Sequence, residues 1–520
     1  MIATNRVVNS VGETVGFIVD DQYMGYYTVL DGVDLIDNLC CENNKVKELN
    51  ALDTISMNDV NKQTLRKLCE KNPFVRDIQN DFKYWLSVDS YSDLVLYLSG
   101  ARQTGKTTEL LKFGYSTFEQ IIYVDLSQKN ILDNFVKLVV NSSNKSMGMT
   151  KFCKTIGEKY SNSETTFLII DEVQESSEVY NVLRTLRQGL RCKIATTGSY
   201  LARILTPKFF KPAGDTFDLE MLPLSFREFA RVFGLEDKLD NISIFGKSEQ
   251  ADYKCLTDLY NTYLQVGGYP AVVHSYRQDG IEATGDILKS LIKRFVDEST
   301  AYFKGDRSRT IFLNTFKAAL LYQLIEKKGT AKETTELITN FINEDNNKMI
   351  VSRKEVNDAV SWLIYSGILG TCDLYNGEKL ELLSDRRIYF KDCGILGYVN
   401  SLVITNDANF KGLRAETFAY NELYRLHQRR KKVLIGDKPC CAVSNNYELD
   451  FLLASLDGKR YGVEIKSKRG EKPKSLEYYT DRKLVDMGII AEITRGGKGE
   501  RFFKIPIYMV SEGYPYEKHN

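Results

Sequence analysis

The sequence GARQTGKT at residues 100–107 constrains the fold of this chain more than any other stretch. An apolar, β-prone run at residues 94–98 precedes it, and helix-favouring residues follow it. In a strand, glycine loop and helix of this kind, successive backbone N–H groups curl around a phosphate, and the positive end of the helix points at it. The stretch therefore predicts a phosphate-binding loop, with a turn that is simply rich in small residues as the alternative.

Individual positions of the loop predict separate roles. We expect Lys106 to reach the β- and γ-phosphates of a nucleotide and the Thr107 hydroxyl to coordinate Mg²⁺. ATP and Mg²⁺ are therefore the expected cofactors. The expected cofactor-binding residues are Gly100, Ala101, Arg102, Gln103, Thr104, Gly105, Lys106, Thr107 and Thr108.

A second element is FLIIDE at residues 167–172, an apolar run that ends in two adjacent carboxylates. Asp171 would hold Mg²⁺ together with Thr107, and Glu172 would polarise the attacking water as the catalytic base. The alternative is an ordinary buried strand that ends in acidic turn residues. Its position after the glycine loop, in a chain of alternating strands and helices, favours the catalytic interpretation.

A third element is KIATTGS at residues 193–199, a predicted strand whose polar end would lie beside the other two. Thr197 or Ser199 would sense the γ-phosphate or orient the water, although a turn of this composition after a strand is common. An arginine that contacts the γ-phosphate cannot be chosen from the sequence. The candidates are Arg184, Arg187, Arg191, Arg203 and Arg227.

The order of patterns along the 520 residues predicts an α/β protein of several domains. Strands alternate with helices around the glycine loop, which favours a parallel sheet covered on both faces and a site at the carboxyl ends of its strands. Helical patterning follows, with a winged-helix-like end, and then a second α/β region. The predicted domains are a small β/helical segment at 1–80, a P-loop ATPase domain at 81–235, a helical and winged-helix-like region at 236–400, and a restriction-endonuclease-like domain at 401–520.

The overall composition excludes several classes of protein. The chain has 70 Lys and Arg against 69 Asp and Glu, so any nucleic-acid surface must be local. Neither a signal peptide nor an apolar run long enough to span a membrane is apparent, so a cytoplasmic location is expected. Ten cysteines without a CxxC pair, and three histidines, do not show zinc-ligand spacing.

Carboxylates gather again near the carboxyl end of the chain. Glu416 lies in a predicted helix, Glu448 and Asp450 in YELDFLL, and Glu464 and Lys466 in VEIKSK. Residues two apart on a strand share a face, so antiparallel pairing would bring Asp450 close enough to Glu464 to share a divalent metal ion. Lys466 would orient the attacking water, which completes a catalytic set for phosphodiester hydrolysis. The alternative is a hairpin with charged residues on its solvent-exposed face.

Basic residues surround this second group. Between residues 411 and 475 there are 15 Lys or Arg and 8 Asp or Glu, an excess of 7 in a nearly neutral chain. Such a local excess suits the phosphate backbone of DNA.

The motif order resembles a widespread prokaryotic group of AAA-type ATPases. The resemblance rests on GARQTGKTTELL, LIIDEVQES, IATTGSYLARIL, LEMLPLSFREFA, YLQVGGYPAVV and IYFKDCGIL, and it covers residues 90–470 approximately. It implies a P-loop ATPase domain followed by a domain of unknown function with a PD-(D/E)XK nuclease-like core. It also implies that Asp171 and Glu172 are the Walker B pair and that residues 197–199 form the sensor strand. The usual loop of the group has an arginine where this chain has Gln103.

Two functions remain open from these patterns. The first is an ATPase whose nucleotide cycle controls a nuclease-like, DNA-binding C-terminal domain. The second is an ATP-dependent switch that binds protein partners and carries a catalytically silent nuclease fold. A metabolic kinase is disfavoured, because the acidic pair is typical of hydrolases and no acceptor-substrate motif is present. The oligomeric state stays open.

Overall fold

The computed structural model forms two compact units, Met1–Leu222 with Arg231–Gly234, and Pro223–Ala230 with Leu235–Asn520. The residues that it describes are 5–8, 14–19, 22–25, 74–139, 145–199, 214–243, 246–302, 308–325, 334–345, 350–403, 407–429, 436–445, 447–456, 458–467, 470, 472–499 and 501–512. Within these residues, no helix is both long enough and apolar enough to cross a bilayer.

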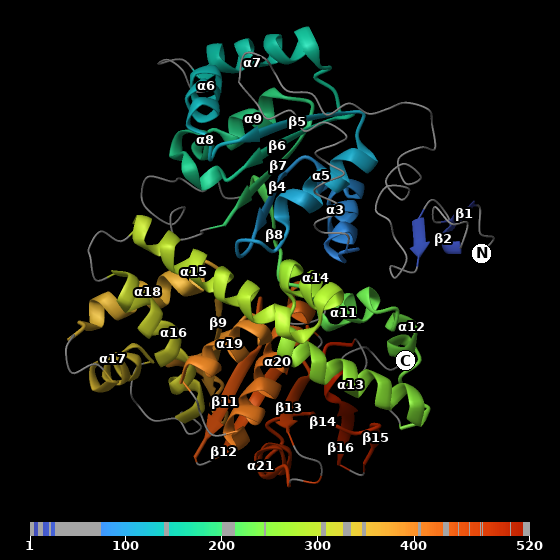
Figure 1. The fold of residues 1–520 in the computed structure, drawn as a ribbon, viewed down its shortest axis with the longest axis vertical. Helices are drawn as coiled ribbons and strands as arrows, with labels where there is room; N and C mark the ends of the chain where they lie inside the picture. Colours follow the sequence, from blue (N-terminus) through green and yellow to red (C-terminus); the bar gives the residue numbers. More distant parts are fainter. Residues whose placement is uncertain are drawn as a thin grey trace. The chain divides into compact units, whose positions relative to one another are not determined.

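The first unit contains a five-stranded parallel sheet with the order β5-β6-β7-β4-β8 (Figure 1). This sheet confirms the predicted parallel α/β fold. The edge strand β8 was not predicted, because its sequence TFDLE shows little of the apolar content of the other strands. The strands are β4 Val95–Ser99, β5 Gln120–Asp125, β6 Thr166–Asp171, β7 Lys193–Gly198 and β8 Thr216–Glu220.

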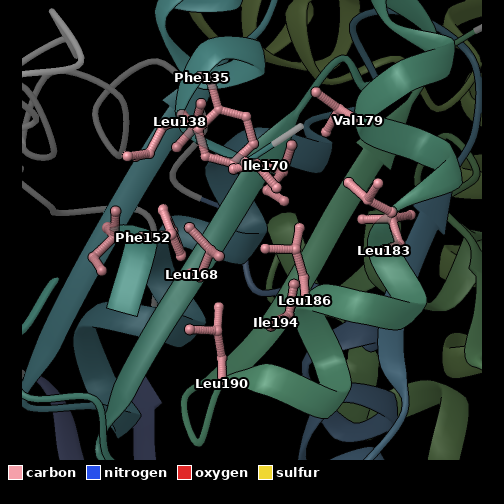
Figure 2. Packing of buried hydrophobic residues seen from close by; sticks show 14 of the residues in the cluster. Phe135, Leu138, Phe152, Leu168, Ile170, Val179, Leu183, Leu186, Leu190 and Ile194 are labelled. Atoms are coloured by element: carbon pink, nitrogen blue, oxygen red, sulfur yellow. The ribbon is translucent and has the colours of Figure 1, made fainter. Parts of the chain in front are cut away.

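Helices cover both faces of this sheet, because its central strands are apolar on both sides. Alternate residues of β6 show the division: Leu168 and Ile170 belong to one core cluster, Phe167 and Ile169 to the other. Figure 2 shows the first cluster, which includes Phe135, Phe152 and Leu183 of the covering helices. These helices are α6 Lys129–Val139, α7 Lys145–Lys159, α8 Ser177–Asn181 and α9 Leu183–Gly189, and the opposite face carries α3 Ile78–Ser87 and α5 Lys106–Thr117.

The N-terminal segment contains a three-stranded antiparallel sheet of β1 Asn5–Val8, β2 Thr14–Val19 and β3 Gln22–Gly25. The stretch VGFIVDD, whose apolar and β-branched residues favour a strand, overlaps β2. A second stretch of strand-like content, YYTVLDG, and the polar stretch at residues 58–73, which has helical content, lie outside the described residues.

The second unit begins with helices. The helical patterning predicted for this region is found as helices that include α15, α16 and α18. The last of these has a capping box in which Ser352 and Glu355 bond each other's backbone N–H groups. The helices are α11 Phe226–Val232, α12 Glu236–Asp240, α13 Gln250–Val266, α14 Pro270–Asp279, α15 Thr284–Tyr302, α16 Ser308–Ile325, α17 Thr334–Asp345, α18 Arg353–Tyr365, α19 Cys393–Val403, α20 Asp407–Arg429 and α21 Lys474–Asp481.

A mixed sheet of eight strands completes this unit, in the order β10-β9-β11-β12-β13-β14-β16-β15. β9 and β10, which we expected as a wing, form one edge of this sheet, and β9 pairs in parallel with β11. The sheet thus extends across residue 400, where the sequence predicted a boundary. The strands are β9 Leu369–Asn376, β10 Glu381–Phe390, β11 Cys440–Ser444, β12 Tyr447–Ala454, β13 Arg460–Lys466, β14 Met487–Glu492, β15 Gly497–Lys498 and β16 Phe502–Pro506.

Candidate nucleotide-binding site

The glycine loop connects β4 directly to α5, as the motif predicts. Gly100 has a φ of 139°, and a Cβ atom there would lie 2.3 Å from the carbonyl oxygen of Met221. Gly105, immediately before α5, has a φ of 99°. Both positions therefore favour glycine, because other residues rarely adopt these backbone conformations. At Gly100 the close approach of the Met221 backbone is a second reason.

Lys106 is buried, and its ammonium group donates hydrogen bonds to the carbonyl oxygens of Gly100 and Ala101, each at 2.9 Å. The Thr104 hydroxyl donates to the same Ala101 oxygen at 2.8 Å. The lysine thus lies across the loop whose backbone N–H groups would hold the phosphates. A nucleotide phosphate would offer this ammonium a charged acceptor in place of neutral carbonyls.

Arg76 supports the loop from outside the motif. Its buried guanidinium donates hydrogen bonds to the carbonyl oxygens of Thr104 at 3.1 Å and Leu222 at 2.6 Å. Arg76 could not be predicted, because nothing in the adjacent sequence distinguishes it from a surface arginine before a helix.

Asp171 is the last residue of β6, and its carboxylate accepts hydrogen bonds from three hydroxyl groups. Thr107 donates to its Oδ2 atom at 2.7 Å, Tyr123 donates to the same atom at 2.8 Å, and Thr197 donates to Oδ1. Thr197 reaches Asp171 because β7 lies between β6 and β4 in the sheet. The predicted residues of the glycine loop, β6 and β7 therefore come together at the carboxyl ends of the strands. Tyr123, from β5, was not predicted.

Burial raises the pKa of Asp171, and the neighbouring Glu172 carboxylate raises it further. The hydroxyl groups of Thr197, Thr107 and Tyr123 act in the opposite direction, but they do not outweigh burial. A cation at this carboxylate would therefore relieve an unfavourable buried charge. Hydroxyl and carboxylate oxygens are also the ligands that Mg²⁺ prefers, so Thr107 and Asp171 fit the predicted metal.

Glu172 has a left-handed backbone conformation with a φ of 54°. Its backbone N–H donates to Oδ1 of Asp171 at 3.0 Å and to Oγ1 of Thr197 at 3.2 Å. Its carboxylate accepts hydrogen bonds from Ser199 at 3.0 and 3.1 Å and from the Gln174 amide. The two candidates from the third strand therefore contact different carboxylates, Thr197 at Asp171 and Ser199 at Glu172.

The arginine candidates have other partners. Arg184 and Arg187 both pair with Asp215, at 3.4 and 2.7 Å, just before the start of β8. Arg191 precedes the start of β7, so these three arginines lie at the amino ends of the strands, opposite the glycine loop. Arg227 pairs with Glu512 at 3.0 Å and Asp240 at 2.6 Å in the second unit, and Arg203 lies outside the described residues.

The C-terminal carboxylates also come together. Phe451 pairs with Val463 in the antiparallel ladder of β12 and β13, which places Asp450 opposite Glu464. The Ile465 N–H donates to Asp450 at 2.7 Å. Lys466 pairs with Glu464 at 2.7 Å, and the Leu476 N–H donates to the other oxygen of Glu464 at 2.9 Å.

Glu448 completes this group through an ion pair with Arg387 at 2.5 Å. Burial raises the pKa of Glu448 to about 8; Arg387 opposes that rise, whereas Asp450 and Glu416 add to it. Burial and Asp450 likewise raise the pKa of Glu464, against the effect of Lys466. Across the described part of the chain, no group of three or more His, Cys, Asp and Glu side chains is arranged to hold a metal ion.

Residues 92–230 match the family model of an AAA domain. Together with the parallel sheet and the strand–loop–helix arrangement, this match assigns the segment a P-loop ATPase fold of the AAA type. Residues 257–407 match a domain of unknown function, DUF8612, which ends before Asp450 and Glu464. The nuclease-like core therefore stays a prediction.

Solved structures with weak similarity include the ORC2 protein of Aeropyrum pernix in ADPNP and ADP complexes. The two sequences are 12% identical, the match covers 64% of this chain and 95% of that chain, and the TM-score is 0.32. The ORC1 protein of the same organism in complex with DNA has 12% identity, coverages of 69% and 98%, and a TM-score of 0.28. Cdc6p of Pyrobaculum aerophilum has 13% identity, coverages of 66% and 94%, and a TM-score of 0.24. Similarity at this level identifies no shared activity. Among curated proteins, none matches the chain.

Proposed function

We propose that this protein is an ATPase that binds Mg²⁺–ATP at the glycine loop and hydrolyses it with the Asp171 and Glu172 pair. The observation that carries the proposal is the hydrogen bond of 2.7 Å between Thr107 Oγ1 and Asp171 Oδ2. The hydroxyl that follows the loop lysine and the carboxylate that ends β6 are thus close enough to share one ion. Thr107 and Asp171 would hold this ion, which would supply positive charge to offset the negative charge that develops during phosphoryl transfer.

The remaining groups have complementary roles in this proposal. Lys106 and the loop backbone bind the phosphates, and Glu172 accepts a proton from the attacking water. Ser199 and Gln174 hold the Glu172 carboxylate, so they orient the base. Thr197 donates to the Asp171 carboxylate and accepts from the Glu172 backbone N–H, so it holds the metal-ligand carboxylate beside the backbone of the base.

Two substitutions test the assignment. Lys106→Ala removes the cation that lies across the loop, and we expect it to abolish ATP binding in a titration with a fluorescent ATP analogue. Glu172→Gln keeps the shape of the side chain but removes the base, so ATP should stay bound and unhydrolysed. Lys137→Ala, an exposed lysine on α6, is the matched control and should behave as the parent. Normal binding and hydrolysis by Lys106→Ala would refute the proposal.

We further propose that nucleotide state controls nucleic-acid binding by the second unit. The local excess of Lys and Arg between residues 411 and 475 supports this part. The test is an ATPase assay with and without DNA, in which cleavage of the same DNA is scored. Stimulated hydrolysis supports coupling to DNA, whereas a rate that DNA does not change contradicts it.

The second candidate is a switch that binds protein partners and does not cut DNA. It is favoured by the ion pair between Lys466 and Glu464 and by the backbone N–H groups of Ile465 and Leu476, which donate to Asp450 and Glu464 respectively. Under this hypothesis, Asp450→Ala and Lys466→Ala change no cleavage, because there is none to change. Mg²⁺-dependent nicking that both substitutions remove while ATP hydrolysis persists would favour the nuclease instead.

A further inference from the structure

Gln174 contacts the proposed catalytic base with only one end of its amide group. It lies in the short 3₁₀ helix η3 Val173–Glu175 that follows β6, and its side chain is fully buried. Its Nε2 atom donates to the Glu172 carboxylate, which in its ionised form only accepts hydrogen bonds. The amide oxygen of Gln174 therefore points away from Glu172. Among the described residues, this buried oxygen has no hydrogen-bond partner.

Tyr97 brings a second buried polar group to the same place. It lies on β4, beside Thr196 of β7 in the parallel ladder, and is only 5% exposed. Within the described part of the chain, its hydroxyl also lacks a hydrogen-bond partner. Burial raises the pKa of Tyr97 well above its ordinary value, and the charges of Asp218 and Glu172 add to that rise. The hydroxyl therefore keeps its proton and remains a donor.

Gly198, the last residue of β7, shows how close these two groups lie. A Cβ atom at this glycine would be 2.7 Å from the Tyr97 hydroxyl oxygen and 3.2 Å from the Gln174 amide oxygen. A buried donor and a buried acceptor thus converge on one point at the carboxyl end of β7. Leaving both unpaired costs the desolvation free energy of each group, and a hydrogen bond between them removes both costs.

We propose that Tyr97 is a positioning residue for ATP hydrolysis, whose hydroxyl donates to the Gln174 amide oxygen and thereby holds the amide nitrogen on Glu172. A chain of contacts then runs from β4 through Gln174 to the base, while Ser199 donates to the same carboxylate. Without the Tyr97 hydroxyl, the amide is free to rotate and turn its oxygen towards Glu172, where two acceptors repel each other. The inference rests on the proposed function of Glu172 as the base.

The first experiment measures steady-state ATP hydrolysis by the full chain with Tyr97→Phe, which removes only the hydroxyl. We expect kcat to fall about ten-fold, because one hydrogen bond of the positioning chain is lost. KM for ATP and the affinity for a fluorescent ATP analogue should stay within about two-fold of the parent values, because the hydroxyl acts on the base and not on the nucleotide. A parental kcat in Tyr97→Phe would overturn the proposal.

Tyr160→Phe is the matched control, because it removes the same hydroxyl from the same hydrophobic core cluster. The next residue, Ser161, donates from its backbone N–H to Gln120, the first residue of β5. Tyr160 therefore lies at the amino ends of the strands, opposite the glycine loop. Its variant should hydrolyse ATP at the parental rate. A loss as large as that of Tyr97→Phe would indicate a general effect on the core and contradict a positioning role.

A double-mutant cycle tests whether Tyr97 acts through Gln174. Gln174→Met keeps the length of the side chain but lacks both polar atoms of the amide, so kcat should fall. In the Gln174→Met chain, adding Tyr97→Phe should change kcat by less than about two-fold, because the hydroxyl no longer has its acceptor. A further loss as large as the one in the parent background would show that Tyr97 acts by another route, against the proposal.

Gly198→Ala gives an independent test, which decides if Gln174→Met does not unfold cooperatively. The added methyl group would displace the Tyr97 hydroxyl, so kcat should fall about ten-fold in the parent chain. In the Tyr97→Phe chain the loss should be smaller, because the ring carbon that carries the hydroxyl lies 3.6 Å from this position and leaves room for a methyl group. Equal losses in the two chains would count against the proposed contact.

Glu172→Gln separates failure of this inference from failure of the proposed function. If this variant hydrolyses ATP at the parental rate, Glu172 is not the base, and both proposals are wrong. If hydrolysis depends on Glu172 while Tyr97→Phe matches the parent, only the role of Tyr97 is overturned.

Discussion

The two carboxylate groups of this protein differ in what surrounds them. Asp171 in the first unit accepts hydrogen bonds from three neutral hydroxyl groups. In the second unit, Glu464 and Glu448 are paired with Lys466 and Arg387. A buried carboxylate among neutral donors retains its negative charge for an incoming cation, whereas one paired with a protein cation is already largely neutralised. Similar residue types therefore lie among neutral hydroxyl donors in the first unit and among ion pairs in the second, which supports the metal site proposed for the first unit.

The largest difference in ATP hydrolysis is expected when one aspartate of each carboxylate group is replaced by asparagine. Asp171→Asn removes the charge that is proposed to hold Mg²⁺, so ATP hydrolysis should fall at least about a thousand-fold. Asp450→Asn should leave hydrolysis at the parental rate. Steady-state phosphate release measures both, with circular dichroism as a check on folding. Equal losses in the two variants would break the distinction.

Separating the ion pair of the second unit should affect stability rather than hydrolysis. Arg387→Met leaves Glu448 mostly buried without its cation, which should lower the free energy of unfolding by about 3 kcal/mol. Glu448→Leu in the same chain should restore most of that loss, because no carboxylate is then left unpaired. Urea denaturation of the parent, both single variants and the double variant measures the coupling. A double variant no more stable than Arg387→Met would argue against this account.

Asp392 lies in the second unit, but its carboxylate accepts hydrogen bonds mainly from neutral backbone N–H groups, as Asp171 does from neutral hydroxyl groups. The Gly268 and Ile395 N–H groups donate to it at 2.7 and 2.9 Å, and burial raises its pKa from 3.8 to about 6. A raised pKa in the folded state contributes stability at low pH that is lost as the pH rises through 6. Between about pH 4.5 and 7.5 this group should cost the parent about 2 kcal/mol of unfolding free energy.

Asp392→Asn carries no titrating group at this position and should lack that part of the pH dependence. Urea denaturation of both proteins at the two pH values measures the difference. Parallel stability curves for the two proteins would show that Asp392 titrates normally.

The smallest effect is expected for Tyr123→Phe, which removes one of the three hydroxyl groups from Asp171. Because the tyrosine orients a proposed metal ligand and does not itself bind the metal, the Mg²⁺ concentration for half-maximal hydrolysis should rise about tenfold. The rate at saturating Mg²⁺ should change little. A loss confined to that saturating rate would instead place Tyr123 in the chemical step.

The local geometry of the first candidate site was predictable from the sequence, because the features that define it lie in short stretches of the chain. Backbone conformation at Gly100 and Gly105 and the positions of Lys106 and Thr107 all depend on residues adjacent in the chain. The carboxylate strand was equally recognisable, because an apolar run that ends in acidic residues leaves few alternatives in a parallel sheet. Tyr123 and Arg76 were missed, since each acts only through a contact with a distant segment.

The second unit was less predictable for the same reason. The helix and strand patterns around Glu416, Asp450 and Glu464 were recognised, but the partners of those carboxylates were not. Arg387 reaches Glu448 through the order of strands in the eight-stranded sheet. Strands β9 and β10 were expected to form a separate wing, yet hydrogen bonding to β11 makes them part of that sheet. Strand order depends on contacts across the whole unit, so it cannot be predicted from the periodicity of apolar residues in single strands.

The sequence by itself determined the phosphate-binding loop, the acidic strand end and the alternation of strands and helices that predicts a parallel sheet. Those features depend on local backbone geometry and on side-chain periodicity, which short stretches contain in full. Only the tertiary structure decided which groups face each carboxylate. Electrostatic character depends on burial and on neighbours that are distant in the chain, so it appears only once the chain has folded.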